Sequence, residues 1–250
     1  HQRLHREESV QHRVRGVPVP GQHLAQPYAF AVQMFLHAKK QGARWASTMF
    51  WGIVFGLAIE TALVHASDST YSYGQFLVML GWADKKVPLW VGVGWGTILY
   101  AATWTAQRLA LPWYLRPLAA ALLAVNIDLS LDPIAEQQGF WHWRTKPDEL
   151  TLYGVPFDNF LGWFAIVGSY AGYTRLLFRK IKRGTWGSAY LIPALGAVLS
   201  LVTMLFFGKI IPTIYATFGG QITVFAIVFA IACAISWGYA LKSRRDHEKN

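Results

Sequence analysis

Charged side chains are scarce in this chain. Asp, Glu, Lys and Arg together make up 14% of its 250 residues, against about 25% in an average soluble protein. Apolar residues reach 54% and fill several long segments that carry almost no charge. The core of one soluble domain is too small to bury so many apolar segments. The composition therefore predicts an all-α, polytopic helical bundle embedded in a lipid bilayer.

Cysteine is nearly absent as well, because Cys233 is the only one in the sequence. A single cysteine excludes an internal disulfide and any metal or redox site built on a Cys-x-x-Cys pair. The GxSxG, HExxH, Walker and GxGxxG patterns are missing too, so no common nucleophile, zinc or nucleotide site is indicated. We therefore expect no cofactor and no metal ion, and we look for chemistry among the chain's own side chains.

The net charge of +10 does not indicate a nucleic-acid-binding surface. Lys and Arg lie in the tails and in short loops between apolar segments, which is the pattern that orients a membrane protein. Their distribution predicts that both termini are cytoplasmic and that the protein is integral to the cell membrane. We expect the bilayer and a long apolar molecule as partners and no nucleic acid, and the oligomeric state stays open.

Three parts follow one another along the chain. Residues 1–44 are expected to form a polar tail and a short interfacial helix over 24–38, and residues 242–250 a charged tail. Residues 45–241 form the membrane domain, with loops rich in polar and aromatic residues at 67–86 and 137–157. About six spans are predicted in it, over residues 45–66, 87–109, 118–136, 158–178, 188–207 and 221–241.

Four carboxyl groups lie within or at the end of predicted spans, where an ionisable group is costly and is therefore a functional candidate. These are Glu60 in the first span and Asp128, Asp132 and Glu136 in the third. The i, i+4, i+8 spacing places the last three along one face of a helix. Pro133 removes a backbone donor beside Asp132 and is expected to bend or break that helix. At a rise of about 1.5 Å per residue, these groups fall in the outer half of the membrane.

Asp128 and Asp132 are the strongest candidates for acid–base chemistry. They lie one helical turn apart with no basic residue nearby in the sequence, and two such buried carboxyls tend to share a proton. A carboxylic acid that keeps its proton is what the protonation of an alkene requires. The alternatives are a purely structural pair and a magnesium site formed with Glu136. Magnesium is the weaker alternative, because the spacing is not DDxxD and no Lys or Arg stands beside it to hold a diphosphate.

For each of the two other carboxyl groups, Glu60 and Glu136, a structural interpretation stands beside the functional one. Glu60 is either a functional acid or a hydrogen-bond partner for a Tyr or Trp side chain. Glu136 is either part of the acidic face or an interfacial helix cap.

Aromatic side chains are dense after the third span. An interfacial belt of Trp and Tyr accounts for part of them, and the alternative is a pocket for a long apolar substrate, with ring faces beside a cationic centre. His142 is either a proton relay or an ordinary hydrogen-bonded side chain. The residues that we expect to line such a pocket are Tyr73, Asn126, Trp141, His142, Trp143, Tyr153, Asn159 and Trp163.

Several runs in this region are similar to a known family. They are Leu131-Asp-Pro-Ile-Ala-Glu136, Gly139-Phe-Trp141-His-Trp143, Tyr153-Gly-Val-Pro156 and Asn159-Phe-Leu-Gly-Trp163, with Glu60-Thr61 and Tyr71-Ser-Tyr73 upstream. The chain resembles the carotenoid biosynthesis family that includes the carotenoid 1′,2′-hydratases and bisanhydrobacterioruberin hydratase, over about residues 50–180. The resemblance implies a cofactor-free hydro-lyase that adds water to a terminal isoprenoid double bond of a carotenoid.

The implied activity suits the acidic residues. A protonated carboxyl, Asp132 or Asp128, would give its proton to the alkene, and nearby tryptophan faces would stabilise the carbocation. A neighbouring carboxylate, Glu60 or Glu136, would then activate water. Three rivals stay open: a cyclase or isomerase that uses the same cation, a proton-coupled transporter or carrier of an apolar molecule, and a structural subunit of a membrane complex.

Overall fold

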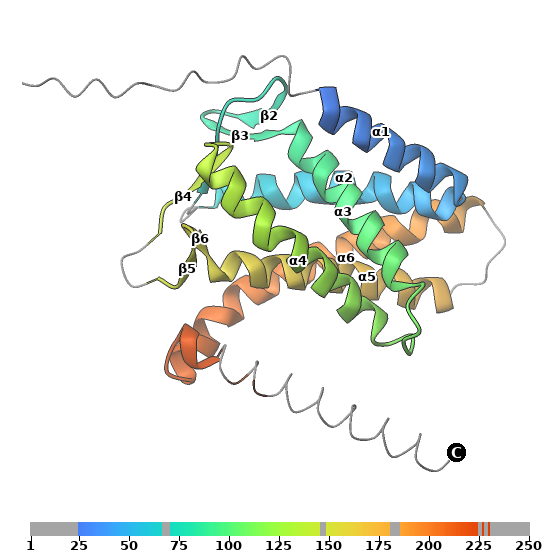
Figure 1. The fold of residues 1–250 in the computed structure, drawn as a ribbon. Helices are drawn as coiled ribbons and strands as arrows, with labels where there is room; N and C mark the ends of the chain where they lie inside the picture. The colour runs from blue at the N-terminus through green and yellow to red at the C-terminus, as the bar shows by residue number, and fades with distance from the viewer. Residues whose placement is uncertain are drawn as a thin grey trace, which may run out of the picture.

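The computed structural model describes residues 25–66, 71–145, 149–180, 186–224, 227 and 230, and within them the protein is mostly helical (Figure 1). Helix α1, predicted over 24–38, packs against α2 and α3. The helices are α1 (Ala25–Lys40), α2 (Ala43–His65), α3 (Leu89–Ala106), α4 (Arg116–Gln137), α5 (Phe157–Lys180) and α6 (Trp186–Thr217).

Short antiparallel strands occupy the two segments that the sequence predicts as loops, so the all-α prediction is incomplete. The strands are β1 (Tyr71–Tyr73) with β4 (Trp141–Trp143), β2 (Met79–Trp82) with β3 (Lys85–Pro88), and β5 (Thr151–Leu152) with β6 (Val155–Pro156). Tyr-Ser-Tyr and Trp-His-Trp alternate aromatic and polar side chains, and this period of two suits an extended strand. The other two pairs close on tight turns with positive φ at Ala83, Tyr153 and Gly154, as hairpin turns require.

Helices α2 to α6 run antiparallel to their neighbours in sequence (Figure 1). Helix α2 packs against α3 and α6, α4 packs against α3 and α5, and α5 packs against α6. One end of the bundle therefore gathers the ends of α2 and α4, the starts of α3 and α5, and the strands, at the left of Figure 1. We call it the acidic end, because Glu60, Asp128 and Asp132 lie near it. The opposite end, where α3 and α5 end and α4 and α6 begin, is called the basic end.

Helices α2 and α3 approach each other unusually closely. Both carry glycines four residues apart, which is the spacing that lets two helix backbones meet inside a membrane. A Cβ atom added at Gly56 would lie 2.3 Å from the Cβ of Trp95. The contact therefore fixes the Trp95 side chain against α2, one turn from Glu60. The four glycines are Gly52 and Gly56 on α2 and Gly92 and Gly96 on α3.

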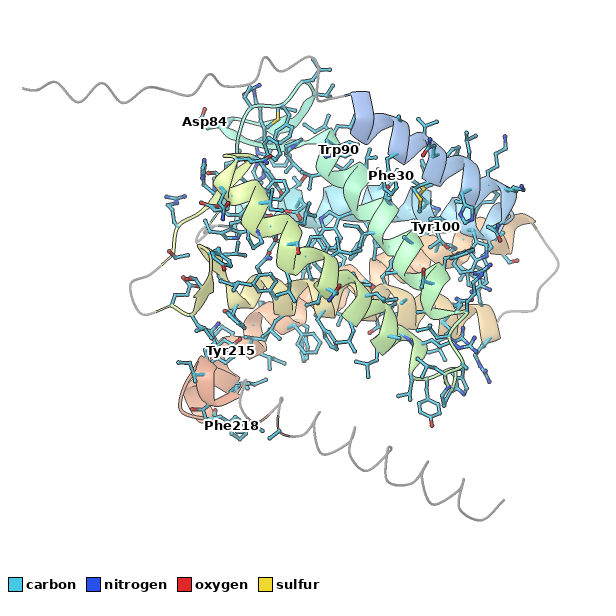
Figure 2. The ribbon with its side chains drawn as sticks, in the orientation of Figure 1. Phe30, Asp84, Trp90, Tyr100, Tyr215 and Phe218 are labelled. Atoms are coloured by element: carbon cyan, nitrogen blue, oxygen red, sulfur yellow. The ribbon has the colours of Figure 1, made fainter. Side chains whose placement is uncertain are left out.

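The buried core connects all five bundle helices. Phe55 of α2 stacks on Tyr170 of α5, with ring centroids 5.7 Å apart. The Tyr170 hydroxyl donates to the backbone oxygen of Thr48 at 2.8 Å, so this buried phenol is satisfied. At the far end of α6, Tyr215 and Gln221 both donate to Asp158 at the start of α5. Figure 2 shows Tyr215 where α6 emerges from the bundle.

Three helices in the described part of the chain are long and apolar enough to cross a membrane, namely α2, α4 and Gly187–Thr217 of α6. Helix α2 has 23 residues, which corresponds to about 35 Å of helix against a hydrocarbon thickness of about 30 Å. Helices α3 and α5 belong to the same bundle but carry more Trp, Tyr, Thr and Gly, which lowers their hydropathy. The total of six spans and the cytoplasmic position of both termini stay predictions, and the span at 221–241 lies mostly outside the described residues.

Candidate active site

Asp128 and Asp132 lie together inside the bundle. Their exposed fractions are 0% and 3%, and their carboxyl groups are within hydrogen-bonding reach of each other. An ionised carboxylate only accepts hydrogen bonds, so a bond between two carboxyls requires a proton on one of them. The i, i+4 prediction of a close pair is confirmed by this geometry.

Asn159, in the first turn of α5, joins the pair from the neighbouring helix. Its Nδ2 donates to Oδ2 of Asp132 at 2.5 Å and to Oδ2 of Asp128 at 3.2 Å. The other Asp128 oxygen, Oδ1, is buried and has no hydrogen-bond partner within the described residues. Helix α4 continues through Pro133 to Gln137, so Pro133 does not break the helix, and the expected bend stays a prediction. Pro133 removes only the backbone hydrogen bond that residue 133 would donate to the Leu129 carbonyl. It lies in the last two turns of α4, and the other backbone hydrogen bonds of the helix persist.

Glu60, in the last two turns of α2, is surrounded by donors. Its Oε2 accepts hydrogen bonds from the hydroxyls of Tyr71 and, at 2.7 Å, Tyr73. Its Oε1 accepts from Trp95 Nε1 at 2.7 Å. The interpretation of Glu60 as a partner for Tyr or Trp is confirmed, because it binds two tyrosines and one tryptophan at once. Each of the three donors therefore finds an acceptor on this one carboxyl group.

The two tyrosines remain donors across the physiological range. Burial raises the pKa of Tyr71 and of Tyr73 well above the usual phenol value, and the adjacent Glu60 charge raises both further. A raised pKa keeps a phenol protonated to a higher pH, so neither hydroxyl ionises near neutrality.

Two stacked indoles connect the carboxyl groups. Trp95 of α3 and Trp163 of α5 have ring centroids 4.3 Å apart and planes tilted by 32°. Trp95 donates to Glu60, whereas the Trp163 indole lies within hydrogen-bonding reach of Asp132. Glu60 is also close enough to interact electrostatically with both aspartates. We call this group the acid cluster, and it consists of Glu60, Asp128, Asp132, Asn159, Tyr71, Tyr73, Trp95 and Trp163.

The β1–β4 pair positions the tyrosines. Tyr71 pairs with Trp143 and Tyr73 with Trp141 in the strand register, so alternate residues of both strands share one face. Tyr71 stacks on Trp143, with centroids 6.2 Å apart, and Tyr73 meets Trp141 edge-on at 6.1 Å. Trp141 and Trp143 therefore contact the acid cluster through the tyrosines.

Glu136 and His142 form a separate contact at the end of α4. Glu136 accepts a hydrogen bond from the backbone nitrogen of Trp143 at 3.1 Å, and its other oxygen lies 3.2 Å from Nδ1 of His142. The His142 side chain is 58% exposed. These contacts hold strand β4 to α4, so the structure does not bring Glu136 or His142 into the acid cluster.

Two further predicted site residues lie on exposed surfaces. Asn126 precedes Asp128 by two residues, or about 200° around a helix, so it occupies the opposite, exposed face of α4. Tyr153 forms the tip of the β5–β6 turn and is 74% exposed. The structure brings together eight of the twelve predicted site residues, six of them directly and Trp141 and Trp143 through ring contacts, and leaves Glu136, His142, Asn126 and Tyr153 outside.

Two members of the acid cluster, Tyr71 and Trp95, are absent from the predicted site residues. Tyr71 lies two residues from the predicted Tyr73, whereas sequence reasoning missed Trp95. Its signal is present in the sequence, because it lies between Gly92 and Gly96 in an apolar helix. A buried indole needs an acceptor for its N–H group, and the small neighbours leave it room to reach a second helix. The Glu60 carboxyl is the acceptor that it finds.

A cavity of about 440 Å³ borders the acid cluster on its polar side. Tyr71 and Tyr73 line it, together with Asp84, Lys85 and Arg144, and Figure 2 shows Asp84 at that end of the bundle. A cavity with several charged side chains suits water better than an apolar chain. It gives water a place next to the tyrosines that bind Glu60.

A family model described as carotenoid biosynthesis protein matches residues 24–238 of the chain. The chain belongs to this family. None of the curated proteins and none of the solved structures matches it. The matched range includes the whole acid cluster, so this carotenoid biosynthesis protein carries its buried carboxyl groups inside the family region. Membership gives it a role in carotenoid metabolism and confirms the resemblance found in the sequence.

Proposed function

We propose that this protein is a cofactor-free membrane hydratase that adds water to a terminal isoprenoid double bond of a carotenoid. The observation that carries the proposal is the buried Asp128–Asp132 pair, whose two carboxyl groups lie within hydrogen-bonding reach of each other. Family membership supports a carotenoid as the substrate class. The separate Glu60, whose oxygens accept hydrogen bonds from three donors, supplies a further carboxyl group near the pair.

The first step is proton transfer from the aspartate pair to the alkene. The carboxyl O–H bond breaks, the π electrons form a new C–H bond at the less substituted carbon, and a tertiary carbocation remains. Asn159 donates to both aspartates, so it stabilises the carboxylate that the transfer leaves behind. Charge-assisted hydrogen bonds of this kind are about twice as strong as neutral ones.

The cation is stabilised by the surrounding rings and carboxylates. Trp95 and Trp163 each lie beside one of the acidic groups, and a cation over a tryptophan face gains about 0.5–2 kcal/mol. The aspartate pair carries a negative charge once it has given up its proton. These groups stabilise positive charge that develops only after proton transfer, which is how a site lowers a barrier.

Water capture completes the reaction. A water molecule attacks the tertiary carbon as Glu60 takes one of its protons, so the product is a tertiary alcohol. The polar cavity beside Tyr71 and Tyr73 supplies that water, and proton exchange through it returns the cluster to its starting state. The cavity favours hydration over cyclisation or isomerisation, because both of those reactions need the cation protected from water.

The membrane setting follows from the same arrangement. A carotenoid is dissolved in the bilayer, whereas water comes from the polar cavity, so the reacting end group must meet both near one membrane surface. We place the acid cluster in the outer half of the cell membrane, on the basis of the charge distribution along the chain.

Product analysis in a lycopene-producing host tests the proposal. Expression of the chain should yield products heavier by one or two water molecules, and Asp132→Asn and Asp128→Asn should each abolish them. Asn126→Ala, on the exposed face of the same helix, is the matched control and should keep full product. Products of unchanged mass would support isomerisation or cyclisation, and full turnover by both aspartate variants would refute the acid role.

A further inference from the structure

Three arginines from two helices converge at the basic end of the bundle. The Arg175 guanidinium lies close enough to Arg116 and Arg179 to be repelled electrostatically by both. The two helices that carry them are in contact next to the arginines, where Gly172 of α5 packs against Pro117 of α4. Like charges that gather without a counter-charge need a reason, because mutual repulsion opposes the arrangement.

Acidic side chains do not provide that counter-charge within the described residues. The described Asp and Glu residues lie in the acidic half of the bundle or in the connections at that end, as Glu60, Asp132 and Asp158 illustrate. No salt bridge to any of the three arginines occurs in the described part of the chain. Within the described residues, the basic end therefore carries positive charge without a counter-charge.

Each arginine is held in place while keeping donors available. Arg116 Nε donates to the backbone oxygen of Leu111 at 3.0 Å, and the Arg179 guanidinium stacks over Trp113 at 4.3 Å. Arg175 Nε is buried and has no hydrogen-bond partner within the described residues. A buried donor without an acceptor is costly, so an absent acceptor is indicated at this position.

We propose that Arg116, Arg175 and Arg179 bind the phosphate of an anionic phospholipid headgroup. Guanidinium groups match phosphate oxygens in geometry and charge, and basic pockets between membrane helices bind such headgroups. Trp113 and Tyr114 beside them are 41% and 62% exposed, as expected of residues at the level of lipid headgroups. The site lies at the opposite end of the bundle from the acid cluster and is independent of it.

Arg108 provides a matched control at the same end. Its guanidinium stacks on Trp104 at 3.4 Å and donates to the Trp104 carbonyl and to Gln41. Its donors are therefore used inside the protein, although it carries the same charge on the same side. A general attraction of basic residues to anionic membranes would involve Arg108 equally. A specific phosphate site formed by the other three arginines would not involve it.

Lipid binding to the purified full-length protein in mixed micelles tests the site. We would titrate phosphatidylglycerol and, separately, phosphatidylcholine, and follow bound lipid by native mass spectrometry. Each of R116Q, R175Q and R179Q should weaken phosphatidylglycerol binding about fivefold, because each arginine near a phosphate contributes about 1 kcal/mol. R108Q should leave the affinity unchanged, and phosphatidylcholine should bind weakly to every variant.

Competition by inorganic phosphate identifies the source of the anion. The proposal requires that millimolar phosphate displaces little phosphatidylglycerol, since the acyl chains also contribute to binding. Efficient displacement would instead assign a free phosphate and overturn the lipid. Equal loss in R108Q, or equal binding of the two lipids, would overturn the site itself. The circular dichroism spectrum of each variant must match that of the parent chain. If R175Q does not fold, R175K, which keeps the charge, replaces it.

Discussion

The single amide of Asn159 bonds to both carboxyls of the aspartate pair. It is the only side chain in the described residues that reaches both aspartates by hydrogen bonds from one group. It therefore fixes the distance between the two carboxyls and stabilises negative charge on either. Its position in the first turn of α5 depends on the β5–β6 hairpin that leads into that helix.

Removal of this amide should affect both stability and turnover. Asn159→Ala leaves two buried acceptors without their donor, and an unsatisfied buried group costs about 1–3 kcal/mol. We expect a lower unfolding temperature in detergent and a reduced rate of product formation, measured in the same membranes. Asn126→Ala is the control and should change neither, because Asn126 is exposed and makes no contact with the cluster. Equal effects of the two substitutions would contradict the assigned role.

The tyrosines on strand β1 hold Glu60 in position. Tyr71→Phe and Tyr73→Phe each remove one hydrogen bond to a carboxyl, and bonds to charged groups contribute about 1.5–3 kcal/mol. Each substitution should lower kcat by roughly 10- to 100-fold with little change in helix content by circular dichroism. The pKa of both phenols is raised, so both stay protonated at the usual phenol pKa. Ionisation of these tyrosines should therefore cause no loss of activity as the pH rises toward that value. Unchanged kcat in the double variant would exclude Glu60 as the base.

The sequence predicts the parts of the site that are local along the chain. Asp128 and Asp132 lie four residues apart on one helix, and helical periodicity alone brings them together. The donors to Glu60 come from positions 11, 13 and 35 residues further along the chain. No spacing rule connects a helix to a strand and to a second helix in this way. Asn126 does not reach the site although it is close to Asp128 in the sequence. Side chains two residues apart point to opposite faces of a helix.

At the scale of elements, the α2–α3 contact determines where Trp95 lies. Gly56 leaves room for the Cβ of Trp95, so the indole can reach Glu60, which lies one helical turn from Gly56. Gly56→Ala should force the helices apart, and overpacking of this kind costs about 1–3 kcal/mol. We expect a lower unfolding temperature and a change in tryptophan fluorescence as Trp95 loses Glu60.

Gly94→Ala provides the comparison for that substitution. Gly94 lies on α3, next to Trp95 in the sequence, and a Cβ added there meets nothing within 4 Å. The substitution should be neutral or slightly stabilising, since alanine is the better helix former. If Gly56→Ala and Gly94→Ala behaved alike in thermal unfolding, the close contact between α2 and α3 would not determine the position of Trp95.

The small strands show why local sequence gives an incomplete account of the elements. The segments 67–86 and 137–157 are polar and lie between apolar runs, so composition predicts loops. Tyr-Ser-Tyr and Trp-His-Trp become strands because they pair with each other across about 70 residues of chain. That pairing requires α2 and α4 to end at the same end of the bundle (Figure 1), so it depends on the bundle rather than on either segment alone.

At the scale of the whole molecule, charge is divided between the two ends of the bundle. Among the described residues, the carboxyl groups lie at the acidic end among aromatic donors, whereas Arg116, Arg175 and Arg179 lie at the basic end without an acidic partner. The arrangement suits a protein that binds a membrane surface at one end and carries out proton chemistry near the other. The three helices long enough to cross a membrane run between the two ends that carry these proposed sites.

The central claim is that the acid cluster protonates an alkene and captures the cation with water. Isotope labelling tests it most directly, by incubating lycopene with membranes that contain the protein in heavy-oxygen water and, separately, in deuterium oxide. The account predicts a product with one solvent oxygen and one non-exchangeable solvent deuterium at each hydrated end, and none from Asp128→Asn or Asp132→Asn membranes. A product that carries solvent deuterium but no solvent oxygen, or labelled product from both variants, would contradict it.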